Sequence, residues 1–202
     1  MKKQVIVVHG GDPGRPYKEF LADLKREKAD ADDFKASKGW KSVMQERLGR
    51  GFEVFNPEMP NSANAMYVEW KIWFDKLVPF IKADAVFVGH SLGGIFLAKY
   101  LSENKLPFMS RGVFLISAPY RRQKNGKPKY FHGFFFKKNL DVISKQAKEI
   151  YLYHSMDDSI VDFSSLKKFQ KELPNAHVIT MKNRGHFIDK EFPELVKAIK
   201  SL

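Results

Sequence analysis

Gly89-His90-Ser91-Leu92-Gly93 follows the apolar run Ala85-Val86-Phe87-Val88 and precedes Gly94-Ile95-Phe96-Leu97-Ala98-Lys99-Tyr100-Leu101, a stretch compatible with a helix. A strand, a tight turn and a helix are therefore expected, with a serine at the tip of the turn. In such a nucleophile elbow the serine backbone is strained, and side chains two residues before and after it would collide. Glycine at both flanking positions avoids that collision. The stretch predicts a nucleophilic serine, Ser91, at the carboxyl end of a strand.

Short apolar runs alternate with amphipathic stretches along nearly the whole chain. The stretches between the runs have helical spacing, and one such pattern is formed by Leu140, Ile143 and Ala147. This alternation predicts an α/β fold, a mainly parallel six-stranded sheet with helices on both faces. No repeat, low-complexity tract or linker interrupts it, so one domain over residues 1–202 is expected. The strands are predicted near Val5–Val8, Phe52–Phe55, Ala85–Gly89, Gly112–Ser117, Ile150–His154 and His177–Met181.

The composition narrows the classes of protein to consider. The 202 residues include no cysteine, which excludes disulfides and thiolate chemistry. No apolar run is long enough to span a membrane, and Val5–Val8 is too short for the core of a signal peptide. A cytoplasmic protein is therefore expected. The net charge of +12 is spread over almost every segment, as in a solvated surface, so no nucleic-acid partner is expected.

Two segments are longer than simple connections between a strand and a helix. Asp12 to Lys38 contains its own amphipathic pattern, and Tyr120 to Lys138 is basic and aromatic. Both leave the carboxyl ends of predicted strands, which is the edge where parallel sheets bind ligands. Residues 12–38 and 120–138 are therefore candidate lids, and Tyr130 and Phe131 are candidate substrate contacts. The alternative for the aromatic run is packing against the sheet edge.

A serine nucleophile needs a base, and that base needs an orienting carboxylate. After a nucleophile elbow, the acid and then the histidine follow along the chain. Among the six histidines, His186 lies in Asn183-Arg184-Gly185-His186-Phe187, between the last predicted strand and the last helix. A loop there can hold an imidazole over the sheet edge. His186 is the predicted base.

The carboxylate is expected in the loop after the preceding strand, where two acids compete. That loop reads Ser155-Met156-Asp157-Asp158-Ser159-Ile160-Val161. An Asp-x-x-Val spacing, with the apolar residue packing after the turn, favours Asp158. Asp157 is the alternative, and otherwise a neighbouring turn residue.

Two backbone N–H groups must also face the oxyanion that develops during acyl transfer. One is predicted from Leu92, at the start of a helix whose dipole favours negative charge. The other is predicted from the turn His9-Gly10-Gly11 after the first strand, with Gly11 preferred and Asp12 as the near alternative.

His9, His90 and His154 all end predicted strands at the same edge, an arrangement that could suggest a metal site. The chain has no H-x-H or H-x-x-x-H pair to support one. Each ring has a simpler role as a hydrogen-bonding group in a loop, and His9 and His90 are also candidate substrate contacts. Neither a metal nor another cofactor is expected.

The chain resembles the small α/β-hydrolases of the YdeN and retinoblastoma-binding-protein serine hydrolase type. The resemblance covers most of the chain and implies a compact α/β-hydrolase fold with a triad on Ser91, Asp158 and His186. It also implies a serine hydrolase, since members of that family are serine hydrolases usually tested as esterases. The motifs that carry it are His9-Gly10-Gly11, Pro57-Glu58-Met59-Pro60-Asn61, Trp70, Gly89-His90-Ser91-Leu92-Gly93-Gly94, Ser117-Ala118-Pro119, Asp157-Asp158-Ser159-Ile160-Val161 and Gly185-His186-Phe187.

The expected activity is hydrolysis of small carboxylic esters or thioesters through an acyl-enzyme intermediate. Two alternatives stay open: an amidase or peptidase acting on small amides, and a binding protein that keeps the fold without catalysis. The first segment, Asp12 to Lys38, looks longer than in the shortest members of the family, and the second is unusually basic. Both departures bear on the choice of substrate rather than on the triad.

Overall fold

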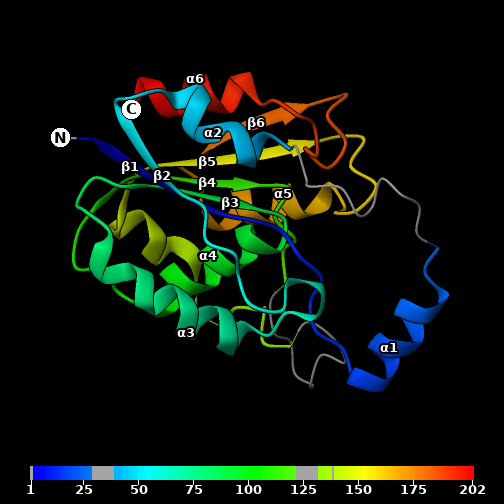
Figure 1. Cartoon of the computed structure of the whole chain (residues 1–202). Helices are drawn as coiled ribbons and strands as arrows, with labels where there is room; N and C mark the ends of the chain where they lie inside the picture. Colours follow the sequence, from blue (N-terminus) through cyan, green and yellow to red (C-terminus); the bar gives the residue numbers. More distant parts are fainter. Residues whose placement is uncertain (1, 29–38, 122–131, 138) are drawn as a thin grey trace.

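A computed structural model describes residues 2–28, 39–121, 132–137 and 139–202. Its centre is a six-stranded sheet with the order β2-β1-β3-β4-β5-β6 (Figure 1). Neighbouring strands are parallel throughout, so the carboxyl ends of the strands meet at one edge. The strands are β1 (Lys3–Val8), β2 (Phe52–Phe55), β3 (Val86–His90), β4 (Ser110–Ile116), β5 (Ala147–Ser155) and β6 (His177–Met181).

Helices cover both faces of the sheet (Figure 1). α2 (Trp40–Leu48) and α6 (Pro193–Ser201) pack on one face, and α3 (Tyr67–Leu77), α4 (Leu92–Glu103) and α5 (Ser164–Glu172) cover the other. α1 (Tyr17–Arg26) extends away from the sheet and has no buried residue. No helix in the described ranges has the length and apolar character needed to cross a membrane. Three short 3₁₀ turns complete the order: η1 (Ser62–Asn64), η2 (Val78–Phe80) and η3 (Leu140–Lys145).

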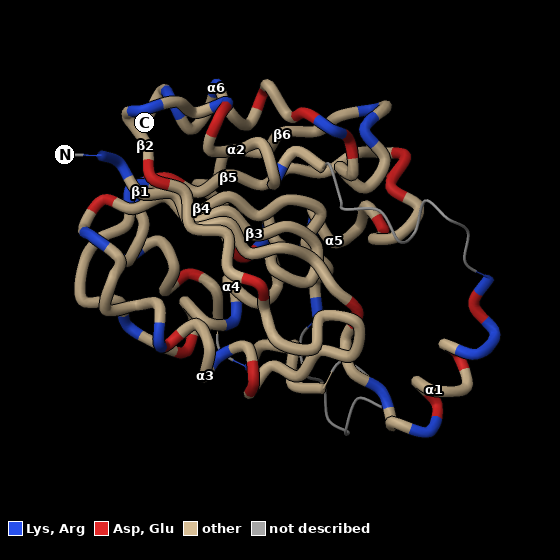
Figure 2. The backbone as a smooth tube through the Cα atoms, in the orientation of Figure 1, with Lys and Arg blue, Asp and Glu red and all other residues tan. Residues whose placement is uncertain are grey.

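The central strands are apolar without interruption because helices bury both of their faces. Val5 to Val8 of β1 are fully buried, and Val113 to Ile116 of β4 are at most 2% exposed. The edge strand β6, by contrast, keeps partly exposed residues along its length. Lys and Arg alternate with Asp and Glu along the helices and loops around the sheet (Figure 2).

The strands predicted from apolar runs are present with small shifts at their ends, but one helix prediction is wrong. The pattern of Leu140, Ile143 and Ala147 predicts a continuous helix, whereas η3 ends at Lys145 and Ala147 opens β5. The reason is Gln146: its carbonyl accepts the N–H of Ser110 at 2.8 Å, which starts the pairing of β4 with β5. A carbonyl used in the sheet cannot continue a helix.

The two candidate lid segments differ in how much of them is described. The amphipathic pattern in residues 12–38 forms α1 as expected. Tyr130 and Phe131 lie outside the described residues, so nothing follows about their role. Phe134 and Phe136, further along the same aromatic run, are fully buried and pack against Trp70 and Tyr120 respectively. These two rings belong to the core.

Trp70 of α3 is fully buried and gives a test of this packing. Its indole N–H donates to the carbonyl of Pro60 at 2.8 Å, and its ring contacts Phe96 and Phe134. Trp70→Ala should lower the free energy of unfolding by about 3–5 kcal/mol, measured by urea denaturation. Val68→Ala, at an exposed position of the same helix, should change it by less than about 0.5 kcal/mol. Equal effects of the two substitutions would contradict the assigned packing.

Candidate active site

Ser91 stands at the tip of a strained turn between β3 and α4. Its backbone has φ 54° and ψ −121°, a conformation that L-residues rarely adopt. A Cβ on Gly89 would lie 2.5 Å from the Gly93 carbonyl oxygen, and one on Gly93 would lie 2.2 Å from the Val8 carbonyl oxygen. Neither contact is possible for a real side chain, so both positions require glycine. The turn lifts the Ser91 side chain above the carboxyl edge of the sheet.

Asp158 and His186 meet at the same edge, from the loops that follow β5 and β6. Nδ1 of His186 lies 2.9 Å from Oδ2 and 3.1 Å from Oδ1 of Asp158. The Asp158 side chain is fully buried, and its Oδ1 accepts the N–H groups of Ile160 and Val161 at 2.9 Å each. Burial by itself would raise the pKa of Asp158, but the hydrogen bonds from Val161 and His186 more than offset it and hold the pKa below its ordinary value. The carboxylate is therefore ionised beside the imidazole.

Asp157 serves the loop of His186 rather than the imidazole. Its Oδ1 accepts the backbone N–H of Gly185 at 3.2 Å and a hydrogen bond from the Ser155 hydroxyl. Ser155 in turn accepts the N–H of Arg184 at 3.1 Å. The pKa of Asp157 is lowered mainly by the hydrogen bond from Ser155. Of the two competing acids, Asp158 contacts the imidazole of His186 directly, whereas Asp157 supports the loop that carries this imidazole.

His90, next to the serine, is turned away from it and holds the histidine loop in place. Its Nε2 donates to the backbone carbonyl of His186 at 2.7 Å, and the two rings lie 4.9 Å apart. Burial, followed by the nearby charge of Lys41, lowers the pKa of His90 well below 6.5. The ring is therefore neutral near pH 7, and its buried Nδ1 has no hydrogen-bond partner within the described residues.

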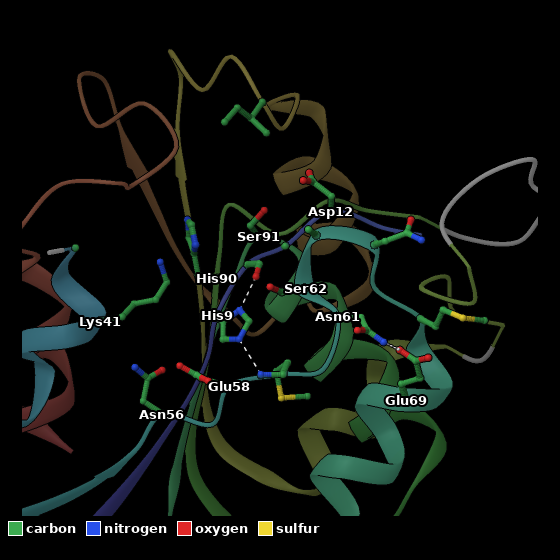
Figure 3. Close-up of a pocket in the computed structure, with 18 of the residues that line it drawn as sticks. His9, Asp12, Lys41, Asn56, Glu58, Asn61, Ser62, Glu69, His90 and Ser91 are labelled. Carbon is green, nitrogen blue, oxygen red and sulfur yellow. Dashed lines mark hydrogen bonds between the residues drawn. The ribbon is translucent and has the colours of Figure 1, made fainter. Parts of the chain in front are cut away.

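His9 braces the turn that carries Gly11. Its Nδ1 donates to the Gly10 carbonyl at 2.5 Å, and its Nε2 accepts the Met59 N–H at 2.9 Å (Figure 3). Both ring nitrogens are thus used within the chain, although the ring lines the pocket. The candidate substrate contact His9 therefore has only its ring carbons to offer a ligand.

The backbone N–H groups near Ser91 separate the two candidates for the second oxyanion donor. The N–H of Asp12 donates to the Ser62 carbonyl at 2.8 Å and is occupied. No acceptor for the N–H of Gly11 occurs in the part of the chain that the structure describes. Leu92 opens α4, where the first N–H groups of a helix have no acceptor inside it. Within the described residues, the N–H groups of Gly11, in the turn after β1, and of Leu92, at the start of α4, are therefore free to bind an oxyanion.

His154, the third histidine at this edge, holds the acid loop. Its Nε2 donates to the Val161 carbonyl at 2.9 Å and lies 3.6 Å from Oδ2 of Asp158. In the described ranges no group of three or more His, Cys, Asp or Glu side chains is arranged to hold a metal. His9, His90 and His154 each hydrogen-bond a different loop.

Ser91 and His186 open into one pocket of about 1350 Å³. No direct hydrogen bond joins them, and such contacts often tighten only when substrate binds. Because Asp158 occupies Nδ1 of His186, Nε2 is the ring nitrogen left for Ser91 or a substrate. Tyr17 and Phe20 of α1 also line the pocket.

The polar residues of the pocket fall on two sides of the serine (Figure 3). Asp12, Asn61 and Ser62 lie on one side, and Lys41, Asn56 and Glu58 lie on the other. Sequence reasoning missed Lys41, Asn56 and Glu58 as pocket residues. Asn56 and Glu58 directly follow β2, and the rule that ligands bind at carboxyl ends could have found them. Lys41 lies within a helical pattern rather than at the end of a strand, so that rule does not mark it as a pocket residue.

Lys41 is partly buried on α2, with its ammonium 4.8 Å from the centre of the Trp40 ring. Burial lowers its pKa from 10.5 to about 8, so the side chain is still mostly charged at pH 7. It is the one Lys or Arg among the described residues that line the pocket.

A parallel sheet with a serine on a strained turn after β3, and a buried His–Asp pair at the same edge, is the architecture of an α/β-hydrolase. The chain belongs to the serine hydrolase family, whose model matches residues 34–200.

Individual relatives agree with this membership. Serine hydrolase RBBP9 from Rattus norvegicus is 23% identical over 176 residues, which is 83% of this chain and 88% of that protein. The ydeN gene product of B. subtilis has a similar fold, with a TM-score of 0.77 at 21% identity over 99% of this chain and 98% of that one. Est1E from Butyrivibrio proteoclasticus follows with a TM-score of 0.61 at 15% identity, covering 99% and 86%. The fold and the enzyme class are thus those of a hydrolase.

The lowered pKa of Asp158 predicts how stability changes in acid. A carboxylate whose folded pKa lies below its ordinary 3.8 stabilises the fold above that value, and the contribution is lost as the pH falls through the folded pKa. The difference in unfolding free energy between the wild type and Asp158→Asn should therefore shrink from about pH 6 to about pH 2, measured by urea denaturation. Asp141→Asn, at an exposed position of η3, controls for the loss of a carboxylate. A difference that stays constant over this range would contradict the assignment.

Proposed function

We propose that this chain hydrolyses small carboxylic esters or thioesters through an acyl-enzyme formed on Ser91, with His186 as the base and Asp158 as its orienting acid. The single observation that carries the proposal is that Ser91 and the His186–Asp158 pair lie at the same edge of the sheet. The strained serine and the imidazole of the buried His186–Asp158 pair both open into one pocket there. The family membership supports a small-molecule acyl substrate.

In the first half of the reaction, the Ser91 hydroxyl attacks the acyl carbonyl while Nε2 of His186 takes its proton. Asp158 keeps Nδ1 as the donor and stabilises the imidazolium that forms. The carbonyl oxygen becomes an oxyanion, which accepts hydrogen bonds from the N–H groups of Leu92 and Gly11. Collapse of the tetrahedral intermediate breaks the bond to the alcohol or thiol, which leaves with the proton from His186.

In the second half, water replaces the leaving group. His186 takes a proton from that water, the hydroxide attacks the acyl carbon, and the bond to Ser91 breaks. The acid product departs, and Ser91 regains its proton from His186. The same groups could act on small amides, which need the proton delivered to a poorer leaving group. Esters and thioesters are the preferred substrates here because an alcohol or a thiol is a better leaving group than an amine.

The substrate contacts beyond the reacting groups are part of the same proposal. Residues 1–202 form one hydrolase domain in this scheme, and the segments 12–38 and 120–138 are its candidate lids. Support comes from α1, which places Tyr17 and Phe20 on the pocket wall. His9 and His90 act mainly by fixing the loops around the serine.

Labelling with a fluorophosphonate tests whether Ser91 is activated. The wild type should gain one adduct by intact-mass analysis, because only a serine with a functioning base reacts rapidly. Ser91→Ala should gain none, and its turnover of a p-nitrophenyl ester should fall by about four orders of magnitude. His186→Ala should react far more slowly than the wild type. A folded wild type that stays unlabelled would favour a binding protein without catalysis, and an active Ser91→Ala would exclude Ser91.

The two neighbouring acids should differ sharply in their effect on rate. Asp158→Asn leaves the imidazole with the wrong tautomer and no counter-charge, so kcat should fall about 10³- to 10⁴-fold. Asp157→Asn weakens only the hydrogen bonds from Gly185 and Ser155 behind the histidine loop and should lower kcat by less than about tenfold. Steady-state kinetics with one ester compares the two, and circular dichroism checks that both variants fold. The reverse order would assign the orienting role to Asp157.

A further inference from the structure

Lys41 is a partly buried cation on the wall of the pocket that holds Ser91. Figure 3 shows its side chain extending from α2 toward His90. The charge of Lys41 is close enough to His90 to help lower the pKa of that ring. His90 adjoins both Ser91 in the chain and the His186 ring in space. A group bound to Lys41 would therefore lie beside the reacting centre.

The ammonium of Lys41 has no carboxylate within 4.0 Å among the residues described, and only the Trp40 ring lies beneath it. Elsewhere the same fold pairs its buried lysine: Lys99, whose side chain is 7% exposed, lies 2.5 Å from Glu103. Removing an ammonium from water without a counter-charge is unfavourable, and the lowered pKa of Lys41 reflects this. A bound anion would supply the missing partner.

The pocket also contains carboxylates, which raises the question of which charge a ligand should carry. Asp12 and Glu58 are exposed and Glu69 is partly exposed, so water reaches all three carboxylates. Glu69 in addition accepts a hydrogen bond from Asn61 at 3.0 Å. Lys41 is the charged group whose desolvation is uncompensated. The energetic gain on binding is therefore largest for a negative group at Lys41.

The start of α2 adds to the same preference. Its first turn contains no acidic residue, and its N-cap, Gly39, provides no side-chain cap. Gly39, Lys41 and Ser42 all line the pocket. The first N–H of the helix, that of Trp40, donates to the Asp189 carbonyl at 3.0 Å, so the start of α2 contributes the positive end of its dipole to the pocket rather than a set of free donors.

We propose that Lys41, at the start of α2, binds a carboxylate or similar anionic group on the substrate and so selects negatively charged acyl compounds. This inference rests on the proposed hydrolase activity and names the substrate class of that site. The anionic group belongs either to the acyl chain or to the alcohol. Its distance from the scissile bond is set by the span from Lys41 past His90 to Ser91.

Matched ester pairs test this selection. The half-ester p-nitrophenyl adipate is compared with p-nitrophenyl hexanoate for charge on the acyl side. For charge on the alcohol side, the acetate of p-hydroxyphenylpropanoic acid is compared with that of p-propylphenol. Each pair gives a ratio of kcat/KM, anionic over neutral. The ratio should exceed one in at least one pair and fall about 10- to 100-fold in Lys41→Met, because a hydrogen-bonded charge contact is lost.

Two further variants separate charge from structure. Lys41→Arg keeps the positive charge and should retain the preference within a few-fold. Lys200→Gln, an exposed lysine on α6 that does not line the pocket, should leave both rates and the ratio unchanged. A wild-type ratio at or below one in both pairs, or a ratio unaffected by Lys41→Met, would overturn the proposal.

A binding measurement keeps this inference separate from the proposed catalysis. Calorimetry on the Ser91→Ala protein, with and without Lys41→Met, compares monoethyl adipate with ethyl hexanoate, and the acetate of p-hydroxyphenylpropanoic acid with that of p-propylphenol. Tighter binding of the anionic ester in either pair that depends on Lys41 supports the anion site, even if the wild type hydrolyses no ester. Equal binding of the anionic and the neutral ester in both pairs would overturn the anion site, even if fluorophosphonate labels Ser91.

Discussion

The arrangement of the site depends on the contact between the backbones of Gly93 and β1. A single methyl group on Gly93 would lie 2.2 Å from the carbonyl oxygen of Val8, so α4 starts directly against the end of the first strand. This approach forces the turn between β3 and α4 to be tight and sets Ser91 at φ 54°. It also places the serine next to Gly10, where a Cβ would lie 3.1 Å from Cβ of Ser91, and Gly11 is the next residue of that turn. One backbone contact thus brings the nucleophile and the proposed oxyanion donor together.

The loops around the serine are fixed by histidines at the ends of three strands. His9 holds the Gly10 turn to the segment after β2, His90 holds the His186 loop, and His154 holds the acid loop. Each ring donates one N–H to a backbone carbonyl. Burying a neutral ring that is hydrogen-bonded in this way carries only a small energetic penalty. The strained Ser91 can persist because its surroundings are determined by the sheet and by these bonds. Rigid strands with braced loops are what a preorganised site requires.

The sequence predicted the features of the structure that depend on residues close together in the chain. The elbow followed from the glycines around Ser91, and the six strands followed from apolar runs that a buried parallel sheet demands. Spacing in the loop after β5 favoured Asp158, the acid that the fold brings to His186. The choice of Gly11 over Asp12 stays a prediction, and the hydrogen bond that occupies the Asp12 N–H, to the Ser62 carbonyl, could not be read from the sequence. The helix expected through Ala147 failed because pairing with β4 outweighed helical spacing.

What sequence could not supply was the environment of individual charges. Most of the described lysines and arginines that contribute to the net charge of +12 are exposed, and along the backbone they interleave with acids (Figure 2). Solvated charges of this kind are screened and carry little specificity. Lys41 looks no different in the sequence, yet α2 carries it into the wall of the pocket, where burial lowers its pKa to about 8. Lys99, also buried, is matched by Glu103 one helical turn away. The difference between these two lysines lies in whether the fold supplies the counter-charge, and at Lys41 that role is left to the ligand.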